Sequence, residues 1–98
     1  MKRHRVKVTS EMCEKGDHTL HACPLALGIN ESLPGIQAAL VNTGVIKVID
    51  LATRLVKLEL KHSRKSREFV RTFDRDKIAV PSIFFLEEVE NPHVRALN

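Results

Sequence analysis

The sequence predicts a single α+β domain, in which an antiparallel sheet of about four to five strands carries two helices in the order β-α-β-β-β-α-β. Several short runs alternate apolar with polar residues, which is the period of a strand. Two other segments repeat apolar residues every three to four positions, which is the period of an amphipathic helix. Because 98 residues suffice for one core, we assign residues 1–98 to one domain. Its ordered core is expected over about 5–87, and a C-terminal tail is expected over 88–98.

The N-terminal third is predicted to form a strand and then a helix. Val6 and Val8 alternate with basic residues, as in a half-buried strand. A Thr-Ser pair then offers a cap for a short helical turn over residues 11–15, which a glycine ends. The first full helix is predicted over residues 24–33. It begins at a proline, which suits the first helical position, and it ends at a Pro-Gly pair.

The middle of the chain is the most strand-like part. Strands are predicted over residues 36–41, 45–50 and 54–61. An Asn-Thr-Gly turn separates the first two, and apolar and charged residues alternate throughout the last. Three such runs with short connections predict an antiparallel meander.

The C-terminal third changes to a helical period and then returns to a strand. Phe69 and Phe73 line one face of a helix that Ser63 or Ser66 can cap, and a turn is predicted over residues 74–77. The final strand is predicted over residues 82–87, which include two consecutive phenylalanines.

The composition limits the compartment and the class of partner. A net charge of +4 and an isoelectric point near 9.4 favour anionic partners. No run approaches the ~20 apolar residues that a membrane span requires, and the N-terminal segment lacks the apolar run of a signal peptide. Two cysteines are too few for a secreted disulfide scaffold. We therefore expect a cytoplasmic protein with reduced thiols and no membrane partner.

Four residues that can ligate zinc lie within eleven positions: Cys13, His18, His21 and Cys23. Zinc prefers tetrahedral sets of this kind. The alternative is that the cysteines are small buried residues and the histidines belong to a surface loop. Cys23 beside His21 at a helix start also suggests an activated thiol, but the sequence offers no orienting acid and no oxyanion loop. We therefore predict no enzyme activity and no cofactor, with a small zinc-binding domain as an alternative.

Basic residues cluster in the last meander strand and in the helix that follows it. Four arginines recur every three or four positions from Arg64 to Arg75, opposite the phenylalanine face. Such a ridge can neutralise phosphates. Alternatively, it is a solvated face that is partly paired with Glu68 and Asp74. The predicted site for an anionic partner consists of Lys57, Lys61, Arg64, Arg67 and Arg71.

Three more cations, Arg3, Arg5 and Lys7, share one face of the first strand. Proteins that bind single-stranded nucleic acid interleave such cations with exposed aromatic residues. The chain has four phenylalanines and no other aromatic residue of the Phe, Tyr and Trp group, and we expect all four in the core. Direct nucleic-acid binding is therefore an alternative to binding another anionic partner.

The predicted strand over residues 45–49 is apolar on both faces except at Lys47. One face can pack on the helices, and the other then requires a cover. A second copy of the chain would supply that cover, which predicts a homo-oligomer.

Three segments carry a resemblance to a family: CPLAL at residues 23–27, FVRTFD at 69–74 and VPSIFFL at 80–86. With the hairpin strands between them, they resemble a family of small uncharacterised α+β proteins encoded by bacteriophages and prophages. The likeness spans residues 6–87 and departs from the family in the histidine-containing loop and in the basicity of the second helix. The resemblance implies a viral origin, an accessory role and action in the host cytoplasm. It implies no functional residues.

The sequence as a whole therefore predicts a non-enzymatic accessory binding protein that acts on a host protein, another host macromolecule or an anionic ligand through its basic surface. A nucleic-acid-binding protein that uses the same basic ridge is the alternative.

Overall fold

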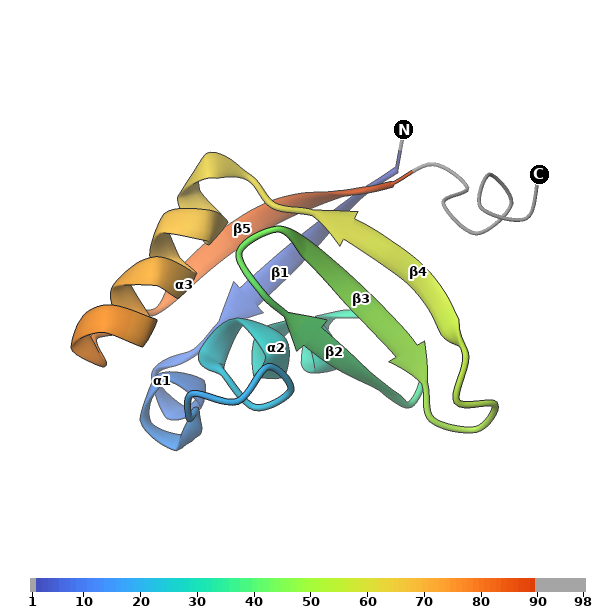
Figure 1. Cartoon of the computed structure of the whole chain (residues 1–98), viewed down its shortest axis with the longest axis horizontal. Coiled ribbons are helices and arrows are strands. Elements are labelled where there is room, and N and C mark those ends of the chain that lie inside the picture. The colour runs from blue at the N-terminus through green and yellow to red at the C-terminus, as the bar shows by residue number, and fades with distance from the viewer. Residues whose placement is uncertain (1, 90–98) are drawn as a thin grey trace.

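The computed structural model describes residues 2–89 and confirms an α+β fold with one antiparallel five-stranded sheet in the order β1-β5-β4-β3-β2 (Figure 1). In chain order the elements are β1 (Arg3–Val8), α1 (Ser10–Lys15), α2 (Pro24–Ser32), β2 (Gln37–Val41), β3 (Val45–Asp50), β4 (Val56–Lys61), α3 (Arg64–Asp76) and β5 (Ser82–Glu88). None of the helices in this part of the chain has the length and apolar character needed to cross a membrane.

Three helices are present where two were predicted, because the short turn expected over residues 11–15 forms α1. The Thr9 hydroxyl caps this helix by accepting a hydrogen bond from the Met12 N–H at 3.3 Å. The helix ends at Gly16, whose N–H donates to the Met12 carbonyl at 2.9 Å. The capping signal in the sequence was therefore correct.

The C-terminal elements are longer than predicted. The turn expected over residues 74–77 is mostly helical, since α3 continues until Lys77 adopts a left-handed conformation with φ 58°. The Lys77 N–H donates to the Phe73 carbonyl at 2.8 Å and closes the last turn. At the other end of β5, the Val89 N–H donates to the Glu59 carbonyl at 2.9 Å, so the predicted tail does not begin at residue 88. Residues 90–98 of that tail lie outside the described residues.

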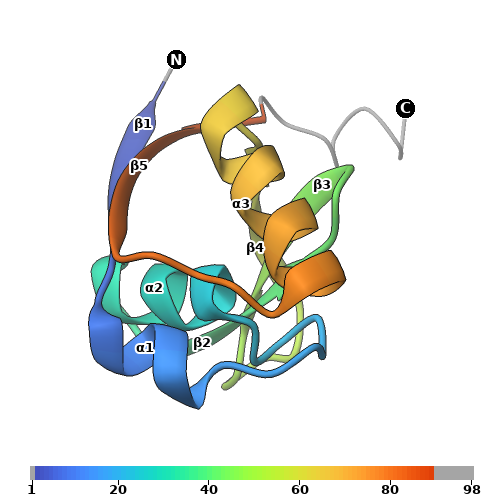
Figure 2. The same ribbon diagram turned by 90° about the vertical axis from the view of Figure 1, so that its left-hand side faces the viewer.

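The sheet curls because β4 and β5 pair over a short length only. The predicted meander of β2, β3 and β4 is confirmed, and β5 pairs with β1 along its length. By contrast, β5 meets β4 only at Leu60↔Glu88 and Lys61↔Glu87. Helix α2 packs against β1 and β2, the two outermost strands. Figure 2 shows the strands curling around α2, with α3 across the open side.

The core lies inside this curl and consists of aliphatic residues with two buried phenylalanines, Phe73 and Phe84. Helix α2 approaches β1 closely at Gly28, where a Cβ atom would lie 2.8 Å from Val8 Cγ2 and 3.0 Å from the Lys7 carbonyl oxygen. Only glycine allows this contact without movement of the strand. Strand β1 is therefore held firmly on its inner side, and its outer side is left to solvent.

His62 is a buried polar residue at the junction of β4 and α3, which sequence reasoning did not single out. Its Nδ1 lies 2.8 Å from the Ser66 hydroxyl oxygen, and its Nε2 contacts the Asn42 carbonyl oxygen. A carbonyl oxygen only accepts hydrogen bonds, so Nε2 carries a proton and donates. Burial lowers the pKa of His62, and the positive charge of Arg67 lowers it further, against the opposing effect of the Asn42 carbonyl.

We therefore expect the protein to lose stability as the pH falls below about 6.5, the ordinary pKa of histidine in an unfolded chain. The folded chain binds this proton less readily than the unfolded chain, so the contribution of His62 is complete above that pH and decreases below it. Urea unfolding at about pH 7.5 and about pH 5.5 tests this, with His62→Gln as the non-titrating control. The free energy of unfolding should fall more between the two pH values in the wild type than in the variant. Equal decreases would contradict the assignment.

Candidate functional site

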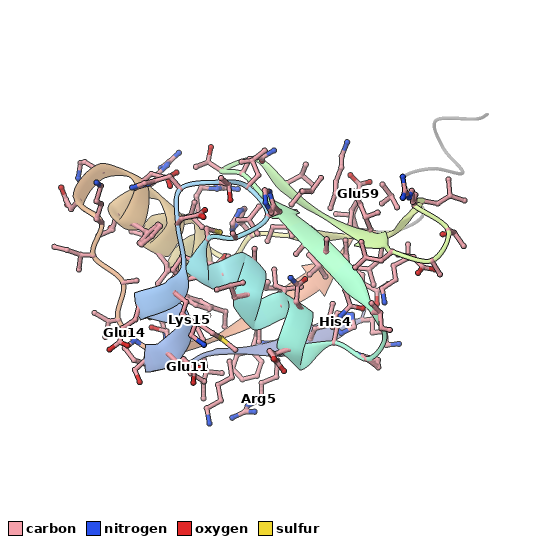
Figure 3. All side chains as sticks on the ribbon, turned by 90° about the horizontal axis from the view of Figure 1, so that it is seen from below. His4, Arg5, Glu11, Glu14, Lys15 and Glu59 are labelled. Carbon is pink, nitrogen blue, oxygen red and sulfur yellow. The ribbon has the colours of Figure 1, made fainter. Side chains whose placement is uncertain are left out.

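Two basic segments lie on the surface. Residues 2–8 contain four Lys or Arg residues and no Asp or Glu, and residues 61–71 contain five Lys or Arg residues and one acid, Glu68. In the first segment Val6 and Val8 are buried, so the alternating residues of β1 face solvent. We call Arg3, Arg5 and Lys7 the β1 strip. In Figure 3 the labelled Arg5 extends away from the ribbon into solvent.

Strand β5 places apolar side chains next to the β1 strip. The register pairs Arg5 with Phe85 and Lys7 with Ile83, so these residues share the outer face of the sheet. Phe85 is 50% exposed, whereas its neighbour Phe84 is 1% exposed on the inner face. The prediction that all four phenylalanines belong to the core is therefore wrong. At β5 the sheet is covered on one face only. Consecutive residues of a strand point to opposite faces, so Phe85 points away from the core.

The exposed phenylalanine is in contact with a cation. The guanidinium carbon of Arg3 lies 5.2 Å from the centroid of the Phe85 ring, within the range of a cation–π interaction. The next residue of β5 on the same outer face is the half-buried Glu87. The register places Glu87 between Arg3 on β1 and Lys61 on β4. Lys61 therefore belongs to the same outer face of the sheet as the β1 strip.

Lys65 connects the β1 strip to α3. Its Nζ lies 3.4 Å from the Ile83 carbonyl oxygen and 5.5 Å from the centroid of the Phe84 ring. Lys7 and Lys65 line a common shallow hollow of about 440 Å³, together with residues 81–83 at the start of β5. Cations from two segments that are distant in the sequence therefore meet at one place on the surface.

Helix α3 is amphipathic as predicted. Ser66, Val70 and Phe73 are buried, and the Phe69 ring packs edge-on against Phe84 with a centroid distance of 5.1 Å. The cations on the opposite side that face solvent are Arg64, Lys65, Arg71 and Arg75. The inward orientation of the phenylalanine side is thus confirmed.

The five cations predicted to bind an anionic partner do not form one group. Lys61, Arg64 and Arg71 are exposed and make no ion pair with another residue in the range 2–89. Arg67 is half-buried, and its Nε donates to the Thr43 carbonyl at 3.0 Å. It therefore ties α3 to the β2–β3 turn.

Lys57 lies at the other end of β4 from α3. Its Nζ donates to the Pro34 carbonyl at 3.1 Å and to the Gln37 side-chain oxygen. It therefore holds the segment that leads into β2, and it is not adjacent to the arginines of α3. The sequence alone could not show this, because both acceptors are more than a dozen residues away from it along the chain.

Of the two acids that were expected to neutralise α3, Glu68 makes no ion pair with another residue in the range 2–89, and Asp74 lies beside His18. Arg75 pairs with Asp76 at 3.0 Å, and Asp74 lies 4.0 Å from His18 Nδ1. Arg64, Lys65 and Arg71 are therefore not paired within residues 2–89, and Glu68 is an exposed acid on the same helix. At the far end of the β1 strip, α1 contributes Glu11, whose carboxylate pairs with Lys15 at 2.7 Å. This acidic residue and Glu14 mark the border of the basic surface (Figure 3).

The structure describes all four of the predicted zinc ligands: Cys13, His18, His21 and Cys23. His18 packs on Phe73, with ring centroids 5.2 Å apart, while His21 is exposed and Cys23 is buried at the N-terminus of α2. No group of three or more His, Cys, Asp or Glu residues between positions 2 and 89 is arranged to hold a metal ion. The close spacing in the sequence is not a close grouping in space, because His18 is turned toward α3.

The cysteines also lack the acidity that the activated-thiol hypothesis requires. Burial raises the pKa of Cys23, and this outweighs the lowering effect of the nearby Ala26 and Leu25 N–H groups. Burial and the nearby Glu14 carboxylate raise the pKa of Cys13. Both thiols are therefore protonated and poorly nucleophilic at neutral pH.

The outer face of the β2–β3–β4 meander is less open than predicted. Val45 and Ile49 are half-buried, and the large apolar residues that are most exposed lie in turns and on β5. The edge of β2 is also protected, since the Val41 N–H donates to the Leu20 carbonyl at 2.8 Å and the Ala39 N–H donates to the Asn30 side chain at 2.9 Å. The homo-oligomer stays a prediction without support from this face.

Comparison of the chain with protein-family models, with curated proteins and with solved structures found no match. The resemblance to phage-encoded proteins therefore stays a prediction, and the function is argued from the basic surface.

Proposed function

We propose that this protein is a non-enzymatic binding protein whose partner is nucleic acid. The observation that best supports this proposal is the hollow that Lys7 of β1 and Lys65 of α3 line together. It brings the β1 strip next to Lys65 of α3, the helix that also carries the exposed cations Arg64 and Arg71, so cations from two elements meet on one surface. A row of phosphates is the partner that a row of cations attracts most strongly, because each contact releases counterions.

The shape of the surface supports a polymer rather than a small ligand. Small-molecule sites are concave and enclose most of the ligand, whereas the cations here lie along a strand and a helix around a shallow hollow. The side chains of Lys61, Arg64, Lys65 and Arg71 are also free to meet phosphates, because none of them makes an ion pair with another residue in the range 2–89. An acidic protein would meet the same cations, so the experiment must distinguish the two polymers.

The test is binding of fluorescently labelled oligonucleotides at increasing salt concentration. With about four to six phosphate contacts, the logarithm of the association constant should fall against the logarithm of the salt concentration with a slope of roughly −3 to −4 for a single strand. Polyglutamate should compete poorly. No oligonucleotide binding at low salt would contradict the proposal, and equal competition by polyglutamate would indicate an acidic protein partner instead.

A further inference from the structure

We infer that the preferred partner is single-stranded nucleic acid and that Phe85 stacks on an unpaired base. This inference rests on the proposed function and names the form of nucleic acid that the same surface takes. The juxtaposition that supports it is a half-exposed phenylalanine within a row of cations on a rigid sheet face.

Phe85 is presented rather than buried because of its place on β5. The residues on either side of it, Phe84 and Leu86, are anchored in the core. The backbone of β5 is also paired with β1 along its length. An aromatic ring on a strand that is fixed in this way loses little further conformational freedom when a ligand packs on it. A large exposed aromatic side chain in this position lowers solubility. A flat apolar ligand that packs on the ring would cover it.

The cations around Phe85 fit a nucleotide that stacks on it. Arg5 lies directly across the register, and the Arg3 guanidinium contacts the ring. Alternate residues along a strand are about 6.6 Å apart, which is comparable to the spacing of successive phosphates in an extended single strand. A base on Phe85 would therefore leave its neighbouring phosphates near the β1 strip. Ile83 extends the apolar surface beside Lys7.

The stacking ring selects single strands over duplexes. In a duplex the faces of the bases are covered by their neighbours, so an exposed aromatic side chain on a flat sheet cannot reach them. In a single strand each base has a free face, and stacking tolerates any sequence. We therefore expect little sequence preference and no strong preference between DNA and RNA.

The first experiment uses the absence of Trp and Tyr from the sequence. The variant Phe85→Trp places a single indole at the site, and stacking should quench its fluorescence. Oligothymidylate and oligouridylate should quench it, whereas inorganic polyphosphate, which offers the charges without bases, should not. The control is Leu55→Trp, at a position that is 68% exposed beside the β3–β4 turn, where no quenching is expected. Equal quenching by polyphosphate, or none by the oligonucleotides, would overturn the inference.

The second experiment separates the stacking contribution from the charge contribution. Phe85→Ala should weaken single-strand binding by roughly tenfold to a hundredfold and should change polyphosphate binding by less than about twofold. Phe85→Leu should resemble alanine, because a leucine is apolar but has no flat ring. If Phe85→Ala binds single strands as tightly as the wild type does, the inference that Phe85 stacks on a base is wrong. The proposed binding through the basic surface would not be contradicted by that result. If the wild type binds no oligonucleotide at low salt, the proposed function fails as well.

Discussion

Replacing Phe84 by alanine is expected to cost about 3–5 kcal/mol of the free energy of unfolding, the usual cost of removing a buried phenylalanine. Phe84 is fully enclosed, with the Phe69 ring packed on its edge at 5.1 Å and Val6 opposite it on β1. It joins α3 to the sheet where β4 and β5 have separated. The cavity left by alanine would lie at this seam, so α3 would lose part of its support.

The measurement is chemical or thermal unfolding of the wild type, Phe84→Ala and the neighbouring variant Phe85→Ala. For a domain of this size, a loss of 3–5 kcal/mol corresponds to a decrease in melting temperature on the order of 15–30 °C. The matched control removes the same side chain one residue away on the outer face. Phe85→Ala should cost at most about 1 kcal/mol, since it loses mainly the contact with Arg3. Similar losses for the two variants would contradict the opposite orientation of the two rings.

The same pair of residues shows what the sequence could and could not predict. The order of strands and helices was predictable, because the apolar periods and the capping residues are local signals. The outward position of Phe85 was also available in principle. If Phe84 and Leu86 face inward on a strand, Phe85 must face outward, provided that only one face of the sheet is covered. The sequence did not reveal whether one face of the sheet or both faces are covered, because strands that are buried on both faces also exist.

The basic surface depended on contacts that no local signal encodes. Lys7 and Lys65 meet only because β5 inserts between β1 and β4 in the sheet order. Lys57 and Arg67 have the same local pattern as the exposed cations, but each donates to a carbonyl from a remote turn. Periodicity placed these side chains on the polar side of their element. It did not show which of these side chains already donate hydrogen bonds within the protein.

Reversing the charge of Arg5 and Lys65 together is expected to weaken nucleic-acid binding by roughly a hundredfold, or about tenfold for each residue. The two residues belong to different elements, and both lie next to β5. Each reversal removes one favourable contact and adds a carboxylate that repels phosphate. The magnitude of the salt-dependence slope should fall by about 0.7 for each contact that is lost to a single strand.

The matched control for each single variant is Arg54→Glu, which changes the net charge equally but lies in the β3–β4 turn, at the other end of the molecule from α3 (Figure 1). At physiological salt, charges act over about 8 Å, so a distant reversal should change the affinity by less than about twofold. Because all three positions are exposed, the free energy of unfolding should stay within about 1 kcal/mol of the wild type, including the loss of the contact between Lys65 and the Phe84 ring. If Arg54→Glu weakens binding as much as Arg5→Glu or Lys65→Glu, overall charge and not the surface around β5 attracts the nucleic acid. If the interface is local, Arg5→Glu and Lys65→Glu must each weaken binding more than Arg54→Glu does. The double variant should then show the combined loss of affinity, because well-separated phosphate contacts contribute additively.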